Sequence, residues 1–318
     1  MDDVLFMAPA RQMKSGLCSS TPHACTTLCR PIMTIKPITP VTPLSAADLD
    51  ALSATDVRTP ITAEALFPAL SSPPFIPSRS LFNLRDLGAV PGSALTTTRF
   101  YRSGFLEGAS RDPEALAWLA SHVRRIFDLR IPEERDKAPD PVVPGVENVW
   151  LAPEEGYPMP PLEDYAVGGG ETAWKKEYMN CALAYRPVIR KILEHVRDRP
   201  TEPVLFHCTA GRDRTGVVAG LLHALAASTA EASTRDYMLS RIGTEPAREK
   251  LLHYAMSTLG VSDPETPGFY NLVSLRPTFW ARFQEALDER FGGWEGYVTS
   301  GMGFSEAELD KIKLNLRS

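Results

Sequence analysis

Residues 207–216 read HCTAGRDRTG and bring a cysteine, an arginine six positions later and two glycines into one short segment. The segment lies between the apolar runs PVLF and VVAGLLHALAA, a pattern that predicts a buried strand, a tight loop and a buried helix. Loop amides, together with the free amides at a helix N-terminus, bind tetrahedral oxyanions. Arg214 adds a planar fork that can hold two anion oxygens at once. The segment therefore predicts an oxyanion-binding loop with Cys208 at its base.

Cys208 has the surroundings of a nucleophile. A helix N-terminus and a nearby guanidinium favour the thiolate form of a cysteine. Such a thiolate can attack phosphorus in line and form a thiophosphate, which water then removes. We expect His207 to hydrogen-bond the loop backbone rather than act as a base, and Thr215 to donate its hydroxyl to the sulfur. The alternative is a buried core cysteine at a strand end, which leaves the neighbouring histidine, glycines and basic residues unexplained.

The rest of the loop is expected to bind phosphate. A glycine inside it lets the backbone turn close to the ligand, and Gly216 permits close packing of the following helix. The predicted phosphate-binding residues are Thr209, Ala210, Gly211, Arg212 and Thr215. This chemistry requires no metal ion and no other cofactor, so none is expected.

Two aspartates are candidates for the acid that protonates the leaving oxygen. Asp213 lies inside the loop, next to Arg214, and is the preferred general acid and later base. Asp128, in FDLR, ends a predicted neighbouring strand and is expected to support it at the pocket. For each aspartate the alternative is a structural carboxylate that fixes an arginine or a loop amide. Arg130 is a further pocket candidate, with a paired or solvated charge as its alternative.

The elements that must position these residues alternate between strands and helices. Strands are predicted over 99–106, 124–131, 146–152 and 202–208, and an amphipathic helix over 112–123. A long helix bent near Pro187 is expected over 172–199, after a Pro- and Gly-rich surface loop, and the C-terminal part is mostly helical. The fold class is α/β, with a central mixed, largely parallel sheet flanked by helices and the phosphate loop between a strand and a helix.

The chain is expected to have two parts. Residues 1–74 are rich in Pro, Ser and Thr and are predicted to be a largely disordered tail, apart from a short helix at SAADLDAL capped by Ser45. Cys18, His23, Cys25 and Cys29 match no zinc spacing, so a metal reading of the tail is disfavoured. Residues 75–318 are predicted to form the catalytic domain.

Composition limits the possible partners and compartment. The formal net charge of -5 argues against a general nucleic-acid binder but leaves room for a local positive pocket. Five cysteines make no disulfide framework, and no apolar run is long enough for a transmembrane segment. The acidic start MDDVLF is unlike a signal peptide. We therefore expect a cytoplasmic protein.

The loop resembles that of the Cys-x5-Arg protein tyrosine phosphatases, and in particular a bacterial and fungal tyrosine-phosphatase-like family with an HCxAGKDRTG loop. NLRDLGAV (83–90), YRSG (101–104), FDLR (127–130) and the C-terminal FWARFQEALDERFGGWEGYVTS resemble other segments of that family, in the same order. The resemblance spans residues 75–318 and implies a phosphatase whose acid stands at Asp213. Family members usually carry Lys at Arg212 and Gly at Ala89, and the first departure weakens a carry-over of phosphoinositide preference, which the family links to that lysine.

The combined prediction is a metal-independent phosphatase acting on phosphate monoesters through a cysteinyl-phosphate intermediate. Phosphotyrosine in a phosphorylated protein is the leading substrate, and dual specificity is left open. The alternatives are a phosphoinositide or inositol-phosphate phosphatase on the same fold and a non-catalytic phosphate-binding scaffold. A sulfurtransferase with a looped cysteine is disfavoured by the histidine before the cysteine and by RTG after it.

Three further motifs receive mainly structural predictions. Arg85 and Asp86 are expected to pin a turn near the loop, and Arg102 is a pocket candidate whose alternative is a surface ion pair. The aromatic residues Phe279, Trp280 and Phe283 have helical spacing and are expected in the core.

Overall fold

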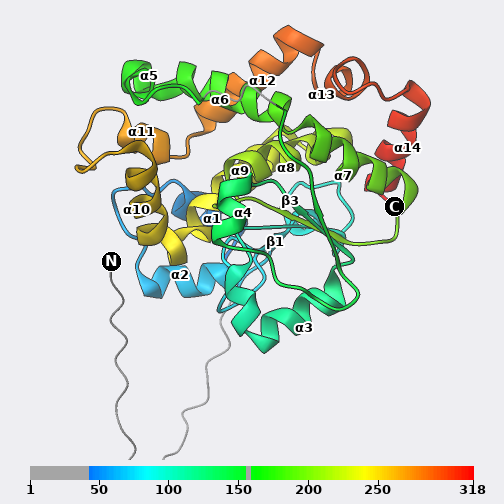
Figure 1. The fold of residues 1–318 in the computed structure, drawn as a ribbon, viewed down its shortest axis with the longest axis horizontal. Helices are drawn as coiled ribbons and strands as arrows, with labels where there is room; N and C mark the ends of the chain where they lie inside the picture. Colours follow the sequence, from blue (N-terminus) through cyan, green and yellow to red (C-terminus); the bar gives the residue numbers. More distant parts are fainter. Residues whose placement is uncertain (1–42, 155–158) are drawn as a thin grey trace, which may run out of the picture. The chain divides into compact units, whose positions relative to one another are not determined.

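The computed structural model describes residues 43–154 and 159–318 and shows the predicted α/β architecture (Figure 1). A five-stranded sheet has the order β1-β2-β5-β3-β4. Its strands are β1 (Arg85–Asp86), β2 (Phe100–Ser103), β3 (Arg125–Asp128), β4 (Glu147–Trp150) and β5 (Val204–His207). The last four are parallel to one another and β1 pairs antiparallel with β2, so the mixed, largely parallel sheet is confirmed.

Both faces of the sheet are covered by helices, because residues along each strand alternate between the two faces. Tyr101, Ile126 and Leu205 belong to one hydrophobic cluster, which contains residues of α3 (Pro113–His122). Phe100, Phe127, Val204 and Phe206 belong to a larger cluster on the other face, built with these helices: α6 (Glu171–Ala184), α7 (Arg186–Asp198), α8 (Asp213–Leu225), α12 (Pro277–Phe291) and α14 (Glu306–Leu316). Figure 1 shows α3 on the opposite side of the strands from α8 and α9 (Ala230–Gly243).

The central strand carries the phosphate loop. β5 lies between β2 and β3, and its residue His207 is paired in register with Ser103 and Asp128. The chain then passes through residues 208–212 into α8, whose N-cap residue is Arg212. The loop therefore starts at the carboxyl end of the middle of a parallel sheet, where ligands of α/β proteins commonly bind.

Other predicted elements are present with small changes. The predicted helix over 172–199 is two helices, α6 and α7, separated at Tyr185, and Pro187 lies in the first turn of α7, where proline is tolerated. Phe279, Trp280 and Phe283 are buried in the core, as predicted. The other α-helices of residues 113–318 are α4 (Pro132–Lys137), α5 (Leu162–Ala166), α10 (Arg248–Leu259), α11 (Phe269–Val273) and α13 (Trp294–Gly296).

Residues 43–74 form structure upstream of the predicted catalytic domain. They include α1 (Ala46–Ser53), with the predicted Ser45–Asp48 capping box, and α2 (Ala63–Leu70). Leu49, Ile61 and Ala69 form a buried cluster with Leu239 and Ile242 of α9. The described part of the predicted tail is therefore packed rather than irregular, because its apolar residues have a helix face to bury against. The domain boundary at residue 75 remains a prediction. Cys18, His23, Cys25 and Cys29, for which zinc binding was disfavoured, lie outside the described residues.

Within the described residues, the helices are too short or too polar to cross a bilayer.

Candidate active site

The loop after β5 is wrapped tightly against the neighbouring strand end. Gly211 has φ +64°, in the left-handed region, and a Cβ there would lie 2.1 Å from the carbonyl oxygen of Ser103. Glycine is therefore needed at this position for both backbone and steric reasons. Gly216 is different, because the nearest atom to a Cβ there is 3.8 Å away, in ordinary contact with Tyr237. The predicted need for a small residue at 216 has no such steric basis.

Cys208 lines a cavity of about 330 Å³. Its residue is 2% exposed, and it shares the cavity wall with five other residues of the loop segment: Thr209, Ala210, Arg212, Asp213 and Arg214. The structure thus brings together the predicted nucleophile, the predicted phosphate fork and the preferred acid. Cys208 and Leu129 belong to the hydrophobic cluster on the α8 side of the sheet, so the cavity opens on that side.

Arg214 is held by a carboxylate that our sequence analysis missed. Its two terminal nitrogens donate to the two oxygens of Glu134, at 2.5 and 2.8 Å, and one of them also donates to the carbonyl of Leu129 at 3.1 Å. This is a bidentate pair of the kind that fixes a guanidinium plane. Glu134 follows FDLRIP in the first turn of α4, where an acidic residue after a strand end and a proline was the available signal.

Glu134 is ionised, and from α4 it contacts both Arg214 and Thr209 of the loop segment. Burial opposes its ionisation, but the hydrogen bonds and charge of Arg214, with a bond from Thr209, outweigh burial and lower the pKa of Glu134 to about 2. Burial likewise opposes the charge on Arg214, whose pKa is nevertheless raised well above its ordinary value by Glu134 and by the charge of Cys208. The fork is therefore a permanent cation beside the sulfur.

Arg212 and Asp213 form a second pair at the cavity wall. The Arg212 Nε donates to both Asp213 oxygens, at 2.9 and 3.1 Å, and its other nitrogens donate to the carbonyls of Val273 (2.6 Å) and Leu272 (3.2 Å). Its guanidinium also lies 5.4 Å from the ring centroid of Trp174. Arg212 is thus committed to protein partners through all three of its nitrogens.

Asp128 and Arg130 lie on the face of the sheet that packs against α3, opposite to the face with Cys208. Both oxygens of Asp128 accept from Arg130, at 2.8 and 2.9 Å, and Asp128 and Arg130 are not among the residues that line the cavity. Strand alternation is the reason, since Asp128 shares its face with Ile126 and Leu205 rather than with Cys208. The expected support of Asp128 and Arg130 at the pocket is therefore not seen in the geometry, which places them in an ion-pair cluster behind the loop.

His207 belongs to this cluster behind the loop. Its Nε2 lies 3.0 Å from Asp140 and 3.9 Å from Asp128, and its Nδ1 has no hydrogen-bond partner among the described residues. The expected bond to the loop backbone is therefore replaced by a carboxylate contact. Burial opposes the charge on His207, but Asp140 and Asp128 outweigh it and raise the pKa of this histidine.

Thr215 lies in the first turn of α8 and is fully buried. Its hydroxyl makes no hydrogen bond within the described part of the chain, so the expected donation to the sulfur is not made in this structure. Its role toward Cys208 remains a prediction.

A buried network holds the loop from outside. Asn83 donates to the carbonyls of Ala210 (3.1 Å) and Gly211 (2.9 Å), and Arg102 donates to the carbonyl of Gly211 (2.6 Å). Two buried side chains therefore fix the carbonyls of the loop at Ala210 and Gly211. Arg102 is fully buried, so it makes no surface pair, and it is not among the residues that line the cavity.

One carboxylate on α9 balances two buried arginines of this network. Asp236 accepts from Arg85 at 2.7 Å and from Arg102 at 2.5 Å. Burial opposes its ionisation, but the two guanidinium groups outweigh burial and hold the pKa of Asp236 well below its usual range. Asp86 accepts from the amides of Gly88 and Thr98, so Arg85 and Asp86 pin structure near the loop as predicted. Asn83 and Asp236 were missed from the sequence, because neither stands in a recognisable pattern with the residues it contacts.

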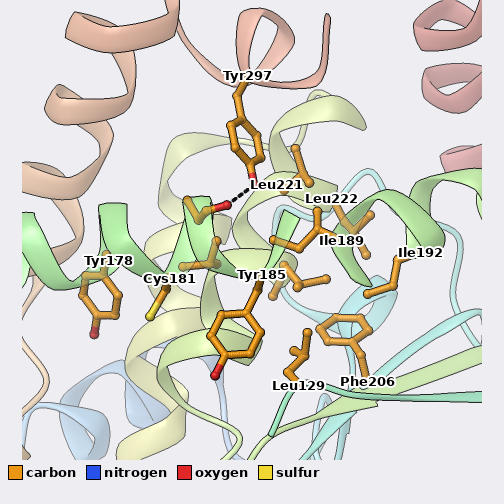
Figure 2. Packing of buried hydrophobic residues seen from close by; sticks show 14 of the residues in the cluster. Leu129, Tyr178, Cys181, Tyr185, Ile189, Ile192, Phe206, Leu221, Leu222 and Tyr297 are labelled. Carbon is orange, nitrogen blue, oxygen red and sulfur yellow. Dashed lines mark hydrogen bonds between the residues drawn. The ribbon is translucent and has the colours of Figure 1, made fainter. Parts of the chain in front are cut away.

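One wall of the cavity is largely apolar. It is formed largely by α10 and the segment after it, with side chains of Leu251, Leu252, Ala255, Leu259, Leu272 and Val273. Cys181 and Tyr185 also line the cavity, and Figure 2 shows Tyr178, Cys181 and Tyr185 projecting from one side of the α6–α7 segment.

The comparison with known proteins agrees with this geometry. The model of the tyrosine phosphatase family matches residues 76–318. The chain belongs to the tyrosine phosphatase family. It is 28% identical over 234 residues to a tyrosine-protein phosphatase of Nostoc commune, a match that covers 72% of this chain and 76% of that protein. It is 25% identical over 118 residues to the triple specificity protein phosphatase PtpB of Mycobacterium tuberculosis, covering 35% of this chain and 42% of that protein. The protein is therefore a tyrosine-phosphatase-like enzyme, and the predicted family resemblance is confirmed.

Proposed function

We propose that this phosphatase hydrolyses aryl phosphate monoesters, phosphotyrosine above all, through a covalent phosphate on Cys208. The observation that carries the proposal is that Cys208 lines one cavity together with Arg214 and Asp213, at the N-terminus of α8. A thiolate, loop amides and a fixed guanidinium supply the nucleophile and the positive charge that phosphoryl transfer requires. A metal ion has no further role in this scheme.

The reaction has two steps. In the first, the Cys208 sulfur bonds to phosphorus, the bond from phosphorus to the leaving oxygen breaks, and protonated Asp213 gives its proton to that oxygen. In the second, Asp213 takes a proton from water as the water oxygen bonds to phosphorus and the sulfur–phosphorus bond breaks. Arg214 binds two equatorial oxygens in both steps through its Nε–H and the second Nη2 hydrogen, which its bonds to Glu134 and Leu129 leave unused within the described residues.

The lining of the cavity favours an aromatic monoester over a polyphosphorylated inositol. The wall formed by α10 and the segment after it is largely apolar, which suits a phenyl ring, whereas a second phosphate would need an available cation. Arg212 is bonded to Asp213 and to two carbonyls, and Arg248 donates to the carbonyls of Val57 and Arg58. A second phosphate would therefore have to bind at the Arg248 Nη1, for which no bond is seen among the described residues, or displace one of these bonds. A non-catalytic scaffold is disfavoured because nucleophile, fork and acid are together.

Replacement of Cys208 tests the mechanism. The variant Cys208→Ser should lose hydrolysis of p-nitrophenyl phosphate while still binding vanadate, because the loop amides and Arg214 remain. Cys181→Ser is the matched control, since Cys181 lines the same cavity from α6 but lies outside the loop. Turnover that survives in Cys208→Ser, or that is lost equally in Cys181→Ser, would refute the covalent scheme.

A substrate panel tests the specificity. Phosphotyrosine peptides should be cleaved with higher kcat/KM than phosphoserine peptides, inositol phosphates and phosphoinositides, and activity should survive EDTA. A preference for phosphoinositides would favour the alternative substrate class, and a strict requirement for added metal would exclude the proposed chemistry.

A further inference from the structure

A pair of buried tyrosines lies directly behind the proposed acid. The Tyr178 hydroxyl is 3.0 Å from Asp213 Oδ1 and 2.8 Å from the Tyr237 hydroxyl. Tyr178 stands on α6 and Tyr237 on α9, so two helices far apart in sequence meet at the side chain of one loop residue. Neither tyrosine lines the cavity, so any effect of theirs on the reaction must pass through Asp213.

The ring of Tyr178 is fixed by aromatic neighbours. It stacks on Trp174 with centroids 4.7 Å apart, and it makes edge contacts with Tyr237 and Trp280, each at 5.9 Å. The side chain is fully buried. Packing of this kind fixes the ring and therefore keeps the phenol oxygen beside Asp213 Oδ1. Burial also raises the pKa of Tyr178 well above its ordinary value, so the phenol stays a neutral donor.

The direction of the two hydrogen bonds follows from the chemistry. An ionised carboxylate can only accept, so Tyr178 must donate its single proton to Asp213. Tyr178 then has no proton left for its neighbour, so Tyr237 donates to Tyr178. The chain therefore runs from Tyr237 to Tyr178 to Asp213.

The two oxygens of Asp213 are left in different situations. Oδ1 accepts from Tyr178 and from the Arg212 Nε, whereas Oδ2 has, among the described residues, only the shared Arg212 Nε, at 3.1 Å. The lone pairs of Oδ2 are the less occupied ones, so Oδ2 is the oxygen that can carry a proton without losing a partner. The Asp213 side chain is 24% exposed and reaches the cavity, where that proton would be used.

We propose that Tyr178, supported by Tyr237, is a positioning residue that fixes the carboxyl of Asp213 and directs its catalytic proton to Oδ2. The inference rests on the proposed function, because it takes Asp213 to be the acid of the first step and the base of the second. Nothing in the chemistry of the pair calls for direct contact with the substrate.

Other charged and titratable groups line the same cavity as Asp213. Arg212, Arg214 and Cys208 belong to its own loop segment, Glu134 to α4, Glu177 and Cys181 to α6, Tyr185 to the α6–α7 junction, and Arg248 and Tyr254 to α10. Tyr165 of α5 lies outside the lining, and burial, with the charges of Glu177 and Asp213, raises the pKa of its phenol. These groups are unchanged by a substitution at Tyr178, so they set a common background for wild type and variants. A change in the pH profile of such variants then reports on the tyrosine hydroxyls.

The test is Tyr178→Phe, which keeps the ring and removes the donor. With phenyl phosphate and phosphotyrosine, which have basic leaving groups, kcat should fall about tenfold, since one of the two groups that orient the acid is lost. With p-nitrophenyl phosphate, whose leaving group needs little protonation, kcat should change less than about twofold. KM should be unaffected for all three.

The pH profile gives a signature that a merely structural role would not produce. A donor to Oδ1 favours the ionised carboxylate, so its removal lets the protonated acid persist to higher pH. The alkaline limb of the kcat profile for phenyl phosphate should therefore move to higher pH by about one unit in Tyr178→Phe. Tyr237→Phe should move it in the same direction by less, and it serves if Tyr178→Phe does not fold.

Tyr165→Phe is the matched control. Tyr165 is fully buried and packs edge-on against the same Trp174, at 5.5 Å, but its hydroxyl has no hydrogen-bond partner in the described ranges, and it does not line the cavity. Its pH profile and its discrimination between the two aryl phosphates should match those of the wild type. If Tyr178→Phe behaves like Tyr165→Phe in both measurements, the positioning role is refuted.

A double variant separates this inference from the proposed function. Asp213→Asn should lower kcat for phenyl phosphate, and Tyr178→Phe should lower it no further in that background. If Asp213→Asn has no effect, the acid assignment and the positioning role both fail. If Asp213→Asn is impaired but the two substitutions multiply in their effects, only the role of Tyr178 fails.

Discussion

Replacing Glu134 with glutamine removes the negative charge that holds Arg214 while it keeps the shape of the side chain. The pKa of Glu134 is about 2, against an ordinary value of 4.5, a difference of about 2.5. At about 1.36 kcal/mol for each pKa unit, the ionised carboxylate stabilises the folded protein by about 3 kcal/mol. The glutamine oxygen can still accept one bond from Arg214, so we expect Glu134→Gln to cost about 2 kcal/mol at neutral pH.

The sign of the pH dependence follows from the lowered pKa. A carboxyl with a depressed folded-state pKa contributes stability that is fully present above its unfolded-state value, here about 4.5, and is lost as the pH falls through the folded-state value, here about 2. The free energy of unfolding of wild type and Glu134→Gln should therefore differ most above about pH 5. The two values should converge between about pH 4.5 and about pH 2.

Urea unfolding followed by tryptophan fluorescence measures this difference, and p-nitrophenyl phosphate turnover measures its effect on catalysis. The kcat/KM of Glu134→Gln should fall by about tenfold or more, since the fork of Arg214 loses the partner that fixes its plane. Glu133→Gln is the matched control, because Glu133 is the neighbouring carboxylate in α4 and is exposed. The reasoning fails if the two variants have equal midpoints and equal turnover, or if the stability difference persists unchanged down to about pH 2.

Three further predictions concern the loop and its supports. Gly211→Ala should abolish activity and lower stability by several kcal/mol, because its Cβ would lie 2.1 Å from a carbonyl oxygen, whereas Gly216→Ala should be neutral or stabilising by about 1 kcal/mol in the same urea experiment. Asn83→Gly keeps the left-handed backbone at φ 57° but removes both bonds to the loop carbonyls, so vanadate affinity should fall about tenfold; unchanged affinity would show that Arg102 alone fixes the loop. Asp140→Asn removes the carboxylate that raises the pKa of His207. A histidine whose pKa is raised in the folded state stabilises the folded protein at pH values below its unfolded-state pKa, and this stabilisation is lost as the pH rises through its folded-state pKa. Its loss of stability should therefore be larger at about pH 5.5 than at about pH 8, and a loss independent of pH would contradict the charged His207–Asp140 pair.

The sequence predicted the local parts of the active site well, because the residues that determine the conformation of the loop are consecutive. An apolar strand, a glycine that must adopt a positive φ and a helix start are all consecutive, so Cys208 and Arg214 could be placed without knowledge of the rest of the fold. The four parallel strands were found for the same reason, since each is a short apolar run between turn signals.

Contacts between distant segments could not be predicted in this way. Asp236 lies inside α9, 151 positions from Arg85, and nothing in the intervening sequence marks it as the partner of two buried arginines. Glu134 meets Arg214 across 80 positions because α4 starts beside the end of β3, a geometry that only the folded chain defines. Tyr178 and Tyr237 meet for a similar reason.

The placement of Asp128 could have been predicted more closely. Its distance along β3 from Ile126 is even, and β3 pairs with β5 so that Asp128 lies beside His207, one residue before Cys208. An alternating strand sends Asp128 and Cys208 to opposite faces. Being at the end of a neighbouring strand therefore indicated the position of Asp128 less well than strand alternation did, because alternation determines on which face of the sheet a side chain lies.

Helix α9 ties the first described helices to the site, which matters for how the protein is produced. One side of α9 presents Asp236 to the arginines behind the phosphate loop, and the side with Leu239 and Ile242 is covered by α1, α2 and the segments around them. Arg235 also pairs with Asp50 of α1, at 2.7 Å. A recombinant fragment that begins at residue 76, where the family match starts, would lack α1 and α2 and would expose apolar side chains of α9 to water. A fragment that begins at about residue 43 keeps both sides of α9 buried.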